Sequence, residues 1–415
     1  MGELKLTAFD VTAGDSYLLE FNDKKILVDG GTNINELSGV PNVLDLVVCT
    51  HYDDDHVKGI VNLLNSKTTK VNELWLPDDM SLAGKYIQRE PLYIILLQLK
   101  EAVESHLEFS AKDRMKVGER ICRVMHHHLK EMYFEFAEIE DRCECRQNDD
   151  DESEQDNNRF IKRKIELLKG IYLRCNDYTN DADYLYSDEI VDDDNEEPKE
   201  YQFMRLYGDL LNTFARAAEL KLITDGVKVR WFKYDKKKDC LNVNKSAHSI
   251  RVINAVETVS RMSKPLIEYA CCFLNARYES NKKNRESLVL LFDDEKYPNI
   301  LFNGDSSLYW LDNKKPLVLK CGAVITAPHH GSRTGLHAYD TEYICDDHGL
   351  NKDFVFVRSD SPCTPRYGDR PCVEYVSMKN KYCRDCVSGG SKRLVLTFNG
   401  RINTTVEKYC TCKAK

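Results

Sequence analysis

Short apolar runs alternate with polar breaks over the first 80 residues, a pattern typical of strands joined by tight turns. Gly14-Asp15 and Asn22-Asp23 are turn-forming pairs between the first three runs. Residues 43–49 are almost continuously apolar and β-branched, as in a strand buried on both faces. Residues 57–64 have helical periodicity. The pattern predicts strands over residues 4–11, 17–21, 25–29, 43–49 and 71–76.

Longer helical periodicities dominate the middle of the chain, at residues 93–107, 115–139 and 203–222. Acidic tracts at residues 148–156 and 188–200 are expected to be solvated loops. Short strands then return at residues 287–292, 299–302, 323–326, 354–358 and 394–398. The order predicts an α/β fold in which residues 1–83 and 276–415 form one discontinuous domain and residues 84–275 a mainly helical insertion.

Composition and net charge limit the class of protein and the functions that it can have. The chain has 415 residues, of which 42% are hydrophobic and 31% charged, as expected of a water-soluble globular protein. It has neither an apolar run of about 18 residues nor a leader-like start, which predicts a cytoplasmic protein with no membrane partner. The 16 cysteines are scattered and are expected to be reduced. A net charge of -9 argues against a broad nucleic-acid-binding surface.

The segment from His51 to His56, His-Tyr-Asp-Asp-Asp-His, lies between a predicted strand and a predicted helix. In an extended turn, residues 51, 53 and 55 point to one side, and His56 falls near the helix start. Three adjacent carboxylates repel one another unless a cation is bound. The segment therefore predicts a metal site, with an Asp-rich surface turn as the alternative. Asp305 and the pair His329-His330 each follow a later apolar strand and are candidates for the other half of the site.

Six motifs, taken in order, resemble the metallo-β-lactamase fold, in the branch of the ComEC C-terminal hydrolase domain and the choline-phosphate esterases. They cover roughly residues 1–80 and 280–370 and leave the central helical region unmatched. The motifs are Asp10-Val11 with Gly14-Asp15-Ser16, Ile26-Leu27-Val28-Asp29-Gly30-Gly31, His51 to His56, Ser287-Leu288-Val289-Leu290, Gly304-Asp305, and Pro328-His329-His330-Gly331-Ser332. The resemblance implies an αββα sandwich carrying a large helical insertion.

The same resemblance implies two divalent metal ions. His51 and Asp53 would bind one ion, Asp55, His56 and His330 the other, and Asp305 would bridge them. Asp53 stands where the wider superfamily has histidine, a substitution that the ComEC-like branch shares. This oxygen-rich donor set makes manganese as plausible a metal as zinc.

A metal pair of this kind holds a hydroxide for in-line attack on a phosphodiester. Asp55 would orient the hydroxide, and His329 would contact a phosphate oxygen or protonate the leaving group, unless it only packs and hydrogen-bonds. Asn284 and Ser287 are candidate phosphate ligands or turn-stabilising residues. Arg366 is a candidate phosphate partner or a solvated loop residue.

The substrate class stays open between DNA or RNA and a small cyclic or oligonucleotide signal. A different reading is a metal-binding interaction module with little catalysis, whose helical insertion recruits a protein partner. Four cysteines form a candidate structural zinc site, with free buried thiols as the alternative. They are Cys383, Cys386, Cys410 and Cys412.

Overall fold

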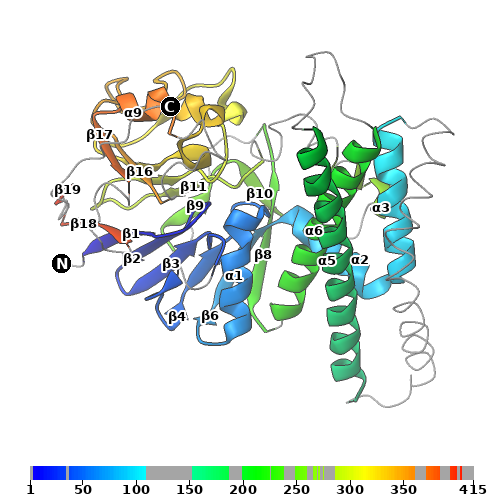
Figure 1. The fold of residues 1–415 in the computed structure, drawn as a ribbon. Helices are drawn as coiled ribbons and strands as arrows, with labels where there is room; N and C mark the ends of the chain where they lie inside the picture. Colours follow the sequence, from blue (N-terminus) through cyan, green and yellow to red (C-terminus); the bar gives the residue numbers. More distant parts are fainter. Residues whose placement is uncertain are drawn as a thin grey trace. The chain divides into compact units, whose positions relative to one another are not determined.

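The alternating N-terminal segment builds most of a nine-stranded sheet in the computed structural model (Figure 1). The strand order is β10-β8-β7-β5-β3-β2-β1-β18-β19, with β3, β5, β7 and β8 parallel to one another. The strands are β1 (Leu4–Phe9), β2 (Tyr17–Phe21), β3 (Lys24–Val28), β5 (Leu46–Val48), β7 (Glu73–Pro77), β8 (Lys228–Tyr234), β10 (Ala255–Thr258), β18 (Arg393–Phe398) and β19 (Ile402–Asn403). The structure describes residues 3–33, 37–108, 152–186, 199–224, 226–237, 248–258, 265–268, 270–271, 274, 286–359, 371–383, 393–399 and 402–403.

The later strands form a six-stranded sheet in the order β17-β16-β14-β12-β11-β9. Strands β12, β14, β16 and β17 run parallel. The strands are β9 (Ile250–Val252), β11 (Leu290–Phe292), β12 (Ile300–Phe302), β14 (Val324–Thr326), β16 (Val355–Arg358) and β17 (Asn380–Cys383). Two small pairs, β4 (Val43–Leu44) with β6 (Lys70–Val71) and β13 (Leu317–Val318) with β15 (Ile344–Cys345), lie beside them. The fold is α/β, as the sequence predicts.

Side chains from both sheets share one core. Leu4, Leu6 and Ala8 alternate along β1 and belong to the same buried cluster as Ile300 and Phe302 of β12. The opposite face of the six-stranded sheet has a second core, covered by short helices (Figure 1). These helices are η3 (Tyr309–Leu311), η5 (Arg333–Tyr339) and α9 (Val373–Ser377).

Helix α1 (Asp54–Ser66) forms where the sequence combines an acidic first turn with an apolar stripe. Asp53 is its N-cap residue, and Lys67 ends it in the left-handed conformation. The helix lies directly against the Gly30-Gly31 turn, since Gly30 N–H donates to His56 O at 2.8 Å. Because Asp53 occupies the cap, Asp55 and His56 fall in the first turn.

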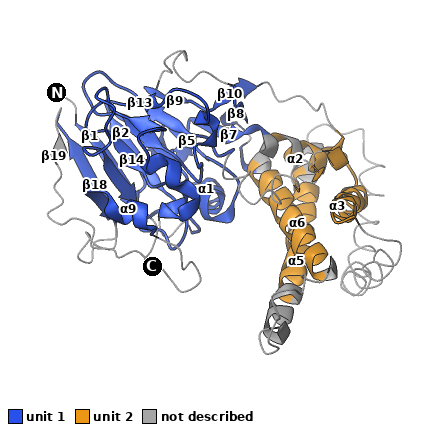
Figure 2. Ribbon diagram, turned by 90° about the horizontal axis from the view of Figure 1, so that it is seen from above, with its two compact units in different colours: residues 1–79, 223–260, 281–415 blue, residues 80–222, 261–280 orange. Residues whose placement is uncertain are grey.

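A second unit is helical and comprises residues 80–222 and 261–280, shown in orange in Figure 2. Its helices are α2 (Asp78–Arg89), α3 (Leu92–His106), α5 (Glu152–Tyr186) and α6 (Lys199–Ile223). Buried Lys164 of α5 donates to the carbonyls of Ile87 and Glu90 at the end of α2, where helix carbonyls lack partners within the helix. Tyr207 of α6 donates to Leu96 O of α3 at 3.2 Å.

The structure differs from the sequence interpretation in the extent of the helical insertion and in both acidic tracts. Residues 223–260, assigned to the helical insertion, belong to the first unit because β8 pairs in parallel with β7. Residues 152–156 of the first acidic tract and 199–200 of the second, expected to be loops, begin helices α5 and α6. The predicted helix at 115–139, and residues 148–151 and 188–198 of the acidic tracts, lie outside the described residues.

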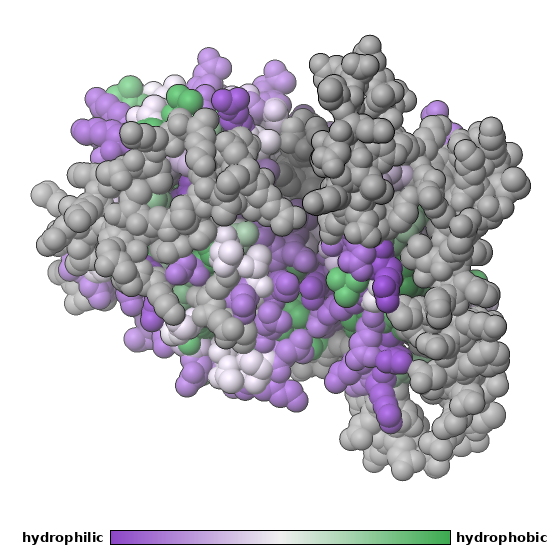
Figure 3. Space-filling model, viewed as in Figure 1, coloured by the Kyte–Doolittle hydropathy of each residue, from purple (hydrophilic) through white to green (hydrophobic). Residues whose placement is uncertain are grey.

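On the face shown in Figure 3, the described residues at the surface are mostly hydrophilic. Hydrophobic residues occur there in small separate groups among hydrophilic ones. Within the described part of the chain, no helix combines the length and the apolar character that membrane crossing requires.

Candidate metal centre

The predicted ligands follow the carboxyl ends of parallel strands, where side chains from several strands meet. His51 follows β5, Asp305 follows β12, and His330 follows β14. Helix α1 adds His56 from its first turn. The fold therefore brings together segments that are distant in the sequence.

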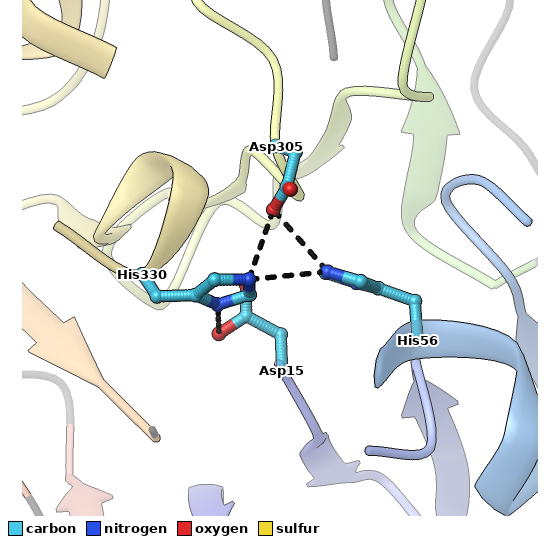
Figure 4. A group of neighbouring side chains, drawn as sticks. All are labelled: Asp15, His56, Asp305 and His330. Atoms are coloured by element: carbon cyan, nitrogen blue, oxygen red, sulfur yellow. Dashed lines mark hydrogen bonds and ion pairs between the residues drawn. The ribbon is translucent and has the colours of Figure 1, made fainter. Parts of the chain in front are cut away.

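Four buried side chains form a group that could hold a metal ion. One potential ligand atom from each lies within 4.8 Å of the other three. Figure 4 shows the four side chains pointing toward one another. They are Asp15, His56, Asp305 and His330.

Asp305 presents its two carboxylate oxygens to different histidines. Oδ1 lies 3.2 Å from Nε2 of His56 and 3.2 Å from Nε2 of His330. Oδ2 lies 3.4 Å from Nε2 of His329 and 3.7 Å from Nε2 of His51. The carboxylate thus divides the imidazoles into two pairs, one at each oxygen.

Asp55 and Asp53 lie beside different imidazole pairs. Asp55 Oδ2 is 3.4 Å from Nε2 of His330, and its Oδ1 is 4.0 Å from Nε2 of His56. Asp53 Oδ2 is 3.9 Å from Nε2 of His51. Although Asp53 is the N-cap residue of α1, its side chain makes no capping hydrogen bond. The structure therefore brings all six sequence-predicted ligands into one place.

Hydrogen bonds orient two of the histidine rings through Asp29. This buried carboxylate accepts from Thr50 N at 2.7 Å and from Thr50 Oγ1 at 2.8 Å. It also lies 2.9 Å from Nδ1 of His56. Because the Thr50 hydroxyl donates to Asp29, it accepts from Nδ1 of His51, 3.1 Å away. Both rings are therefore left with Nε2 facing Asp305 as the nitrogen that can bind a metal.

His330 lies in a strained turn and has a carboxylate beside its Nδ1. Its Nδ1 lies 3.4 Å from Oδ1 of Asp15, on the far side of the ring from the Nε2 that faces Asp305. The φ angles of His329, His330 and Gly331 are 47°, 55° and 82°, all left-handed. Left-handed backbone is unfavourable for residues other than glycine by about 1–2 kcal/mol each. Such strain is typical of functional sites, and here it turns two adjacent histidines inward.

The charged groups of the cluster strongly shift one another's pKa values. Burial opposes ionisation of Asp305, yet the surrounding histidines, His329 first, hold its pKa well below the ordinary value. Burial disfavours the charged form of His330, but Asp305 and Asp15 outweigh it and raise the pKa to about 10. The pKa of His56 is also raised well above its ordinary value, because Asp305, Asp29 and Asp55 outweigh burial. In the absence of a cation, the carboxylates therefore hold protons on these rings.

The donor set fits a divalent ion. Among the described residues, buried atoms Nε2 of His51, Oδ1 of Asp305 and Oδ2 of Asp15 make no hydrogen bond. Buried polar atoms without partners are unfavourable unless something else satisfies them. Carboxylate oxygens mixed with imidazole nitrogens suit zinc and manganese alike.

The sequence interpretation missed the roles of Asp15 and Asp29. Both were matched only as parts of family motifs, although each lies at a strand end next to glycine. His329, expected to be catalytic, lies beside Asp305, and its Nδ1 hydrogen-bonds Thr334 Oγ1. At 16% exposed, its side chain is the most accessible of the four imidazoles.

Most of the predicted substrate-binding residues and zinc-site cysteines lie outside the described residues. Ser287 is fully buried. It lies beside the site, because the next residue, Leu288, donates its N–H to Thr50 O at 2.9 Å. Its substrate contact stays a prediction. Asn284 and Arg366 lie outside the described residues. Of the four predicted zinc-site cysteines, Cys383 is buried, and Cys386, Cys410 and Cys412 lie outside the described residues.

No protein-family model matches the chain, and no curated protein matches it.

Proposed function

We propose that this chain is a metal-dependent hydrolase of the metallo-β-lactamase fold that cleaves phosphodiesters with two divalent ions. The observation that carries the proposal is the carboxylate of Asp305, whose oxygens face two separate pairs of imidazole Nε2 atoms. A carboxylate with nitrogen ligands at each oxygen, His56 and His330 at one and His51 at the other, is suited to bridging two cations. The ordered family motifs and the two sheets that share a core support the same fold.

The ligands divide between the two sides of Asp305. Asp55, His56 and His330 would hold one ion at Oδ1. His51 and Asp53 would hold the other at Oδ2. Bound divalent ions lower the pKa of water and neutralise charge on a phosphoryl group. Manganese and zinc are both compatible with this donor set.

The chain's own residues supply orientation and proton transfer. Asp55 is 28% exposed, in contrast to the buried His56 and His330 beside it, so its carboxylate can accept a hydrogen bond from the attacking water. His329 is partly exposed and is fixed by its hydrogen bond to Thr334. It is therefore positioned to donate a proton to the leaving oxygen.

The proposal is tested with purified protein, manganese or zinc, and four substrates: linear DNA, RNA, cyclic nucleotides and bis(p-nitrophenyl) phosphate. Asp55→Ala is expected to lower cleavage by at least about 100-fold, because it removes both a ligand and the group that orients water. Asp54→Ala is the matched control, as Asp54 is the neighbouring carboxylate in the same helical turn. Asp54→Ala should retain activity.

The pattern of products separates the competing functions. Cleavage of DNA or RNA alone indicates a nuclease, and cleavage of cyclic nucleotides alone indicates a signal-degrading phosphodiesterase. Metal binding without cleavage of any substrate would contradict the hydrolase and favour a metal-binding interaction module.

A further inference from the structure

Asp15 is held by two hydroxyl groups that the proposed chemistry does not use. Ser359 Oγ donates to Oδ1 of Asp15 at 2.9 Å. Tyr17 OH donates to the same oxygen at 3.1 Å. Ser359 directly follows β16, and Tyr17 begins β2, so the two hydroxyls come from different sheets. All three side chains are buried.

The position of Ser359 is fixed from several directions. Its Oγ accepts from Ser16 N at 3.4 Å, and it lies farther from Gly14 O, at 3.4 Å, than from the Asp15 carboxylate. A serine hydroxyl has one proton to donate, and the shorter distance assigns it to Asp15. The end of β16 is thereby joined to the turn that carries Asp15.

Asp15 in turn contacts His330 on the ring nitrogen opposite the metal-facing one. Its Oδ1 lies 3.4 Å from Nδ1, whereas Nε2 lies 3.2 Å from Asp305 Oδ1. A carboxylate at Nδ1 keeps the proton there and leaves the Nε2 lone pair for a metal. The orientation of His330 thus depends on where the Asp15 carboxylate is held.

We propose that Ser359 and Tyr17 are positioning residues that fix Asp15 and, through it, the metal-binding tautomer and orientation of His330. The inference rests on the proposed function, since it takes His330 as a metal ligand. It assigns a role to the end of β16, a strand that contributes none of the predicted ligands. Hydrogen bonds from Thr50 and Asp29 likewise occupy Nδ1 of His51 and His56 and leave Nε2 of both rings facing Asp305.

The test measures manganese and zinc affinity by competition with a chromophoric chelator, which requires no substrate. Ser359→Ala and Tyr17→Phe should each weaken binding by about tenfold, because loss of an outer hydrogen-bond partner typically weakens metal binding 10- to 100-fold. Tyr207→Phe is the matched control, since it removes a buried tyrosine hydroxyl in the helical unit. It should bind metal as the wild type does.

A double-mutant cycle with Asp15→Asn distinguishes positioning from general loosening of the structure. If Ser359 acts through Asp15, adding Ser359→Ala to Asp15→Asn weakens binding by less than about twofold more. A purely structural role would lower the unfolding midpoint of the metal-free protein and leave metal affinity unchanged. That result, or an undiminished effect of Ser359→Ala in the Asp15→Asn background, would overturn the inference.

Failure of the inference is distinguishable from failure of the proposed function. If wild-type protein binds metal and Ser359→Ala binds it equally well, only the role of Ser359 is lost. If the wild type binds no metal, both proposals are contradicted.

Discussion

Oδ1 of Asp305 lies 3.2 Å from Nε2 of His56, although one residue follows β12 and the other lies in helix α1. At this carboxylate, a residue that follows a strand of the six-stranded sheet meets a residue from the helix that follows a strand of the nine-stranded sheet. Asp305→Asn keeps the shape of the side chain and removes its charge. We expect metal affinity to fall by more than about 100-fold, beyond the effect of losing an outer hydrogen-bond partner.

Calorimetric titration with manganese measures this loss. Asp340→Asn serves as the control, because Asp340 is exposed and its side chain accepts a local hydrogen bond from Glu342 N. Equal affinity in the Asp305→Asn and Asp340→Asn variants would exclude Asp305 as the shared ligand.

We predict that Asp29 contributes strongly to the stability of the fold around this site. It accepts hydrogen bonds from Thr50 N and Thr50 Oγ1 and lies against His56 Nδ1. Asp29→Asn places an amide NH₂ group against a donor, so we expect a loss of about 3 kcal/mol in the free energy of unfolding. Urea denaturation of the metal-free protein measures it.

Asp45→Asn is the comparison for Asp29→Asn. Asp45 also accepts from a backbone N–H and a side chain, those of Lys25 and Lys24, but at a more accessible position. A loss of about 1 kcal/mol is expected there. A larger loss for Asp45→Asn than for Asp29→Asn would contradict the role assigned to Asp29.

Gly14 allows the turn before Asp15 to pass directly over Asp55. Its φ is +89°, and a Cβ atom built on it would lie 1.7 Å from the carbonyl oxygen of Asp55. Gly14→Ala must displace backbone at the candidate metal centre, so we expect destabilisation above about 2 kcal/mol together with loss of the proposed hydrolase activity.

Gly226→Ala is the matched control for Gly14→Ala. Gly226 has a similar φ of +83°, but nothing lies within 4 Å of its added Cβ. Only backbone strain of about 1 kcal/mol is expected there, with activity retained. Equal effects of the two substitutions in urea denaturation and activity assays would show that the close approach to Asp55 is unimportant.

How far the sequence predicts this molecule depends on whether an interaction is local. Asp305 and His330 each follow an apolar strand, so their place at a strand end is visible in the sequence. The contacts of Asp29 with His56 and of Ser359 with Asp15 arise only when elements distant in the sequence pack together in the fold. No local pattern encodes them.

The misassigned segment has a similar cause. Strand β8 (Lys228–Tyr234) carries charged residues between its apolar ones and follows a long helical region. Its position in the first sheet depends on Glu73 of β7, which pairs with Lys228 and Arg230 across the strands. Such a partner is visible only in the folded structure.

Glu73 gives a prediction of pH dependence. Burial opposes its ionisation, but hydrogen bonds from Lys228 and Trp75, with the charges of Lys228 and His248, lower its pKa to about 2. Since this pKa lies below the ordinary 4.5, the stabilisation is present above pH 4.5 and is lost as the pH falls toward 2. Glu73→Gln should therefore lower the free energy of unfolding by about 1–3 kcal/mol at pH 7 and by much less near pH 3.

Urea denaturation at both pH values measures the effect of Glu73→Gln. Glu20→Gln is the control, because Glu20 forms a surface ion pair with Lys5 and should change stability by less than about 1 kcal/mol. A Glu73→Gln difference that stays constant between pH 7 and pH 3 would show that the charge of Glu73 is not responsible.

The central claim is that the cluster around Asp305 is a two-metal hydrolytic site. The most direct measurement is the rate of bis(p-nitrophenyl) phosphate hydrolysis by metal-stripped protein as manganese or zinc is added in known equivalents. We predict that the rate rises until two equivalents per chain are bound and then stays level, with Asp305→Asn inactive throughout. Absence of metal-dependent hydrolysis at every ratio, with the protein folded, would contradict the account.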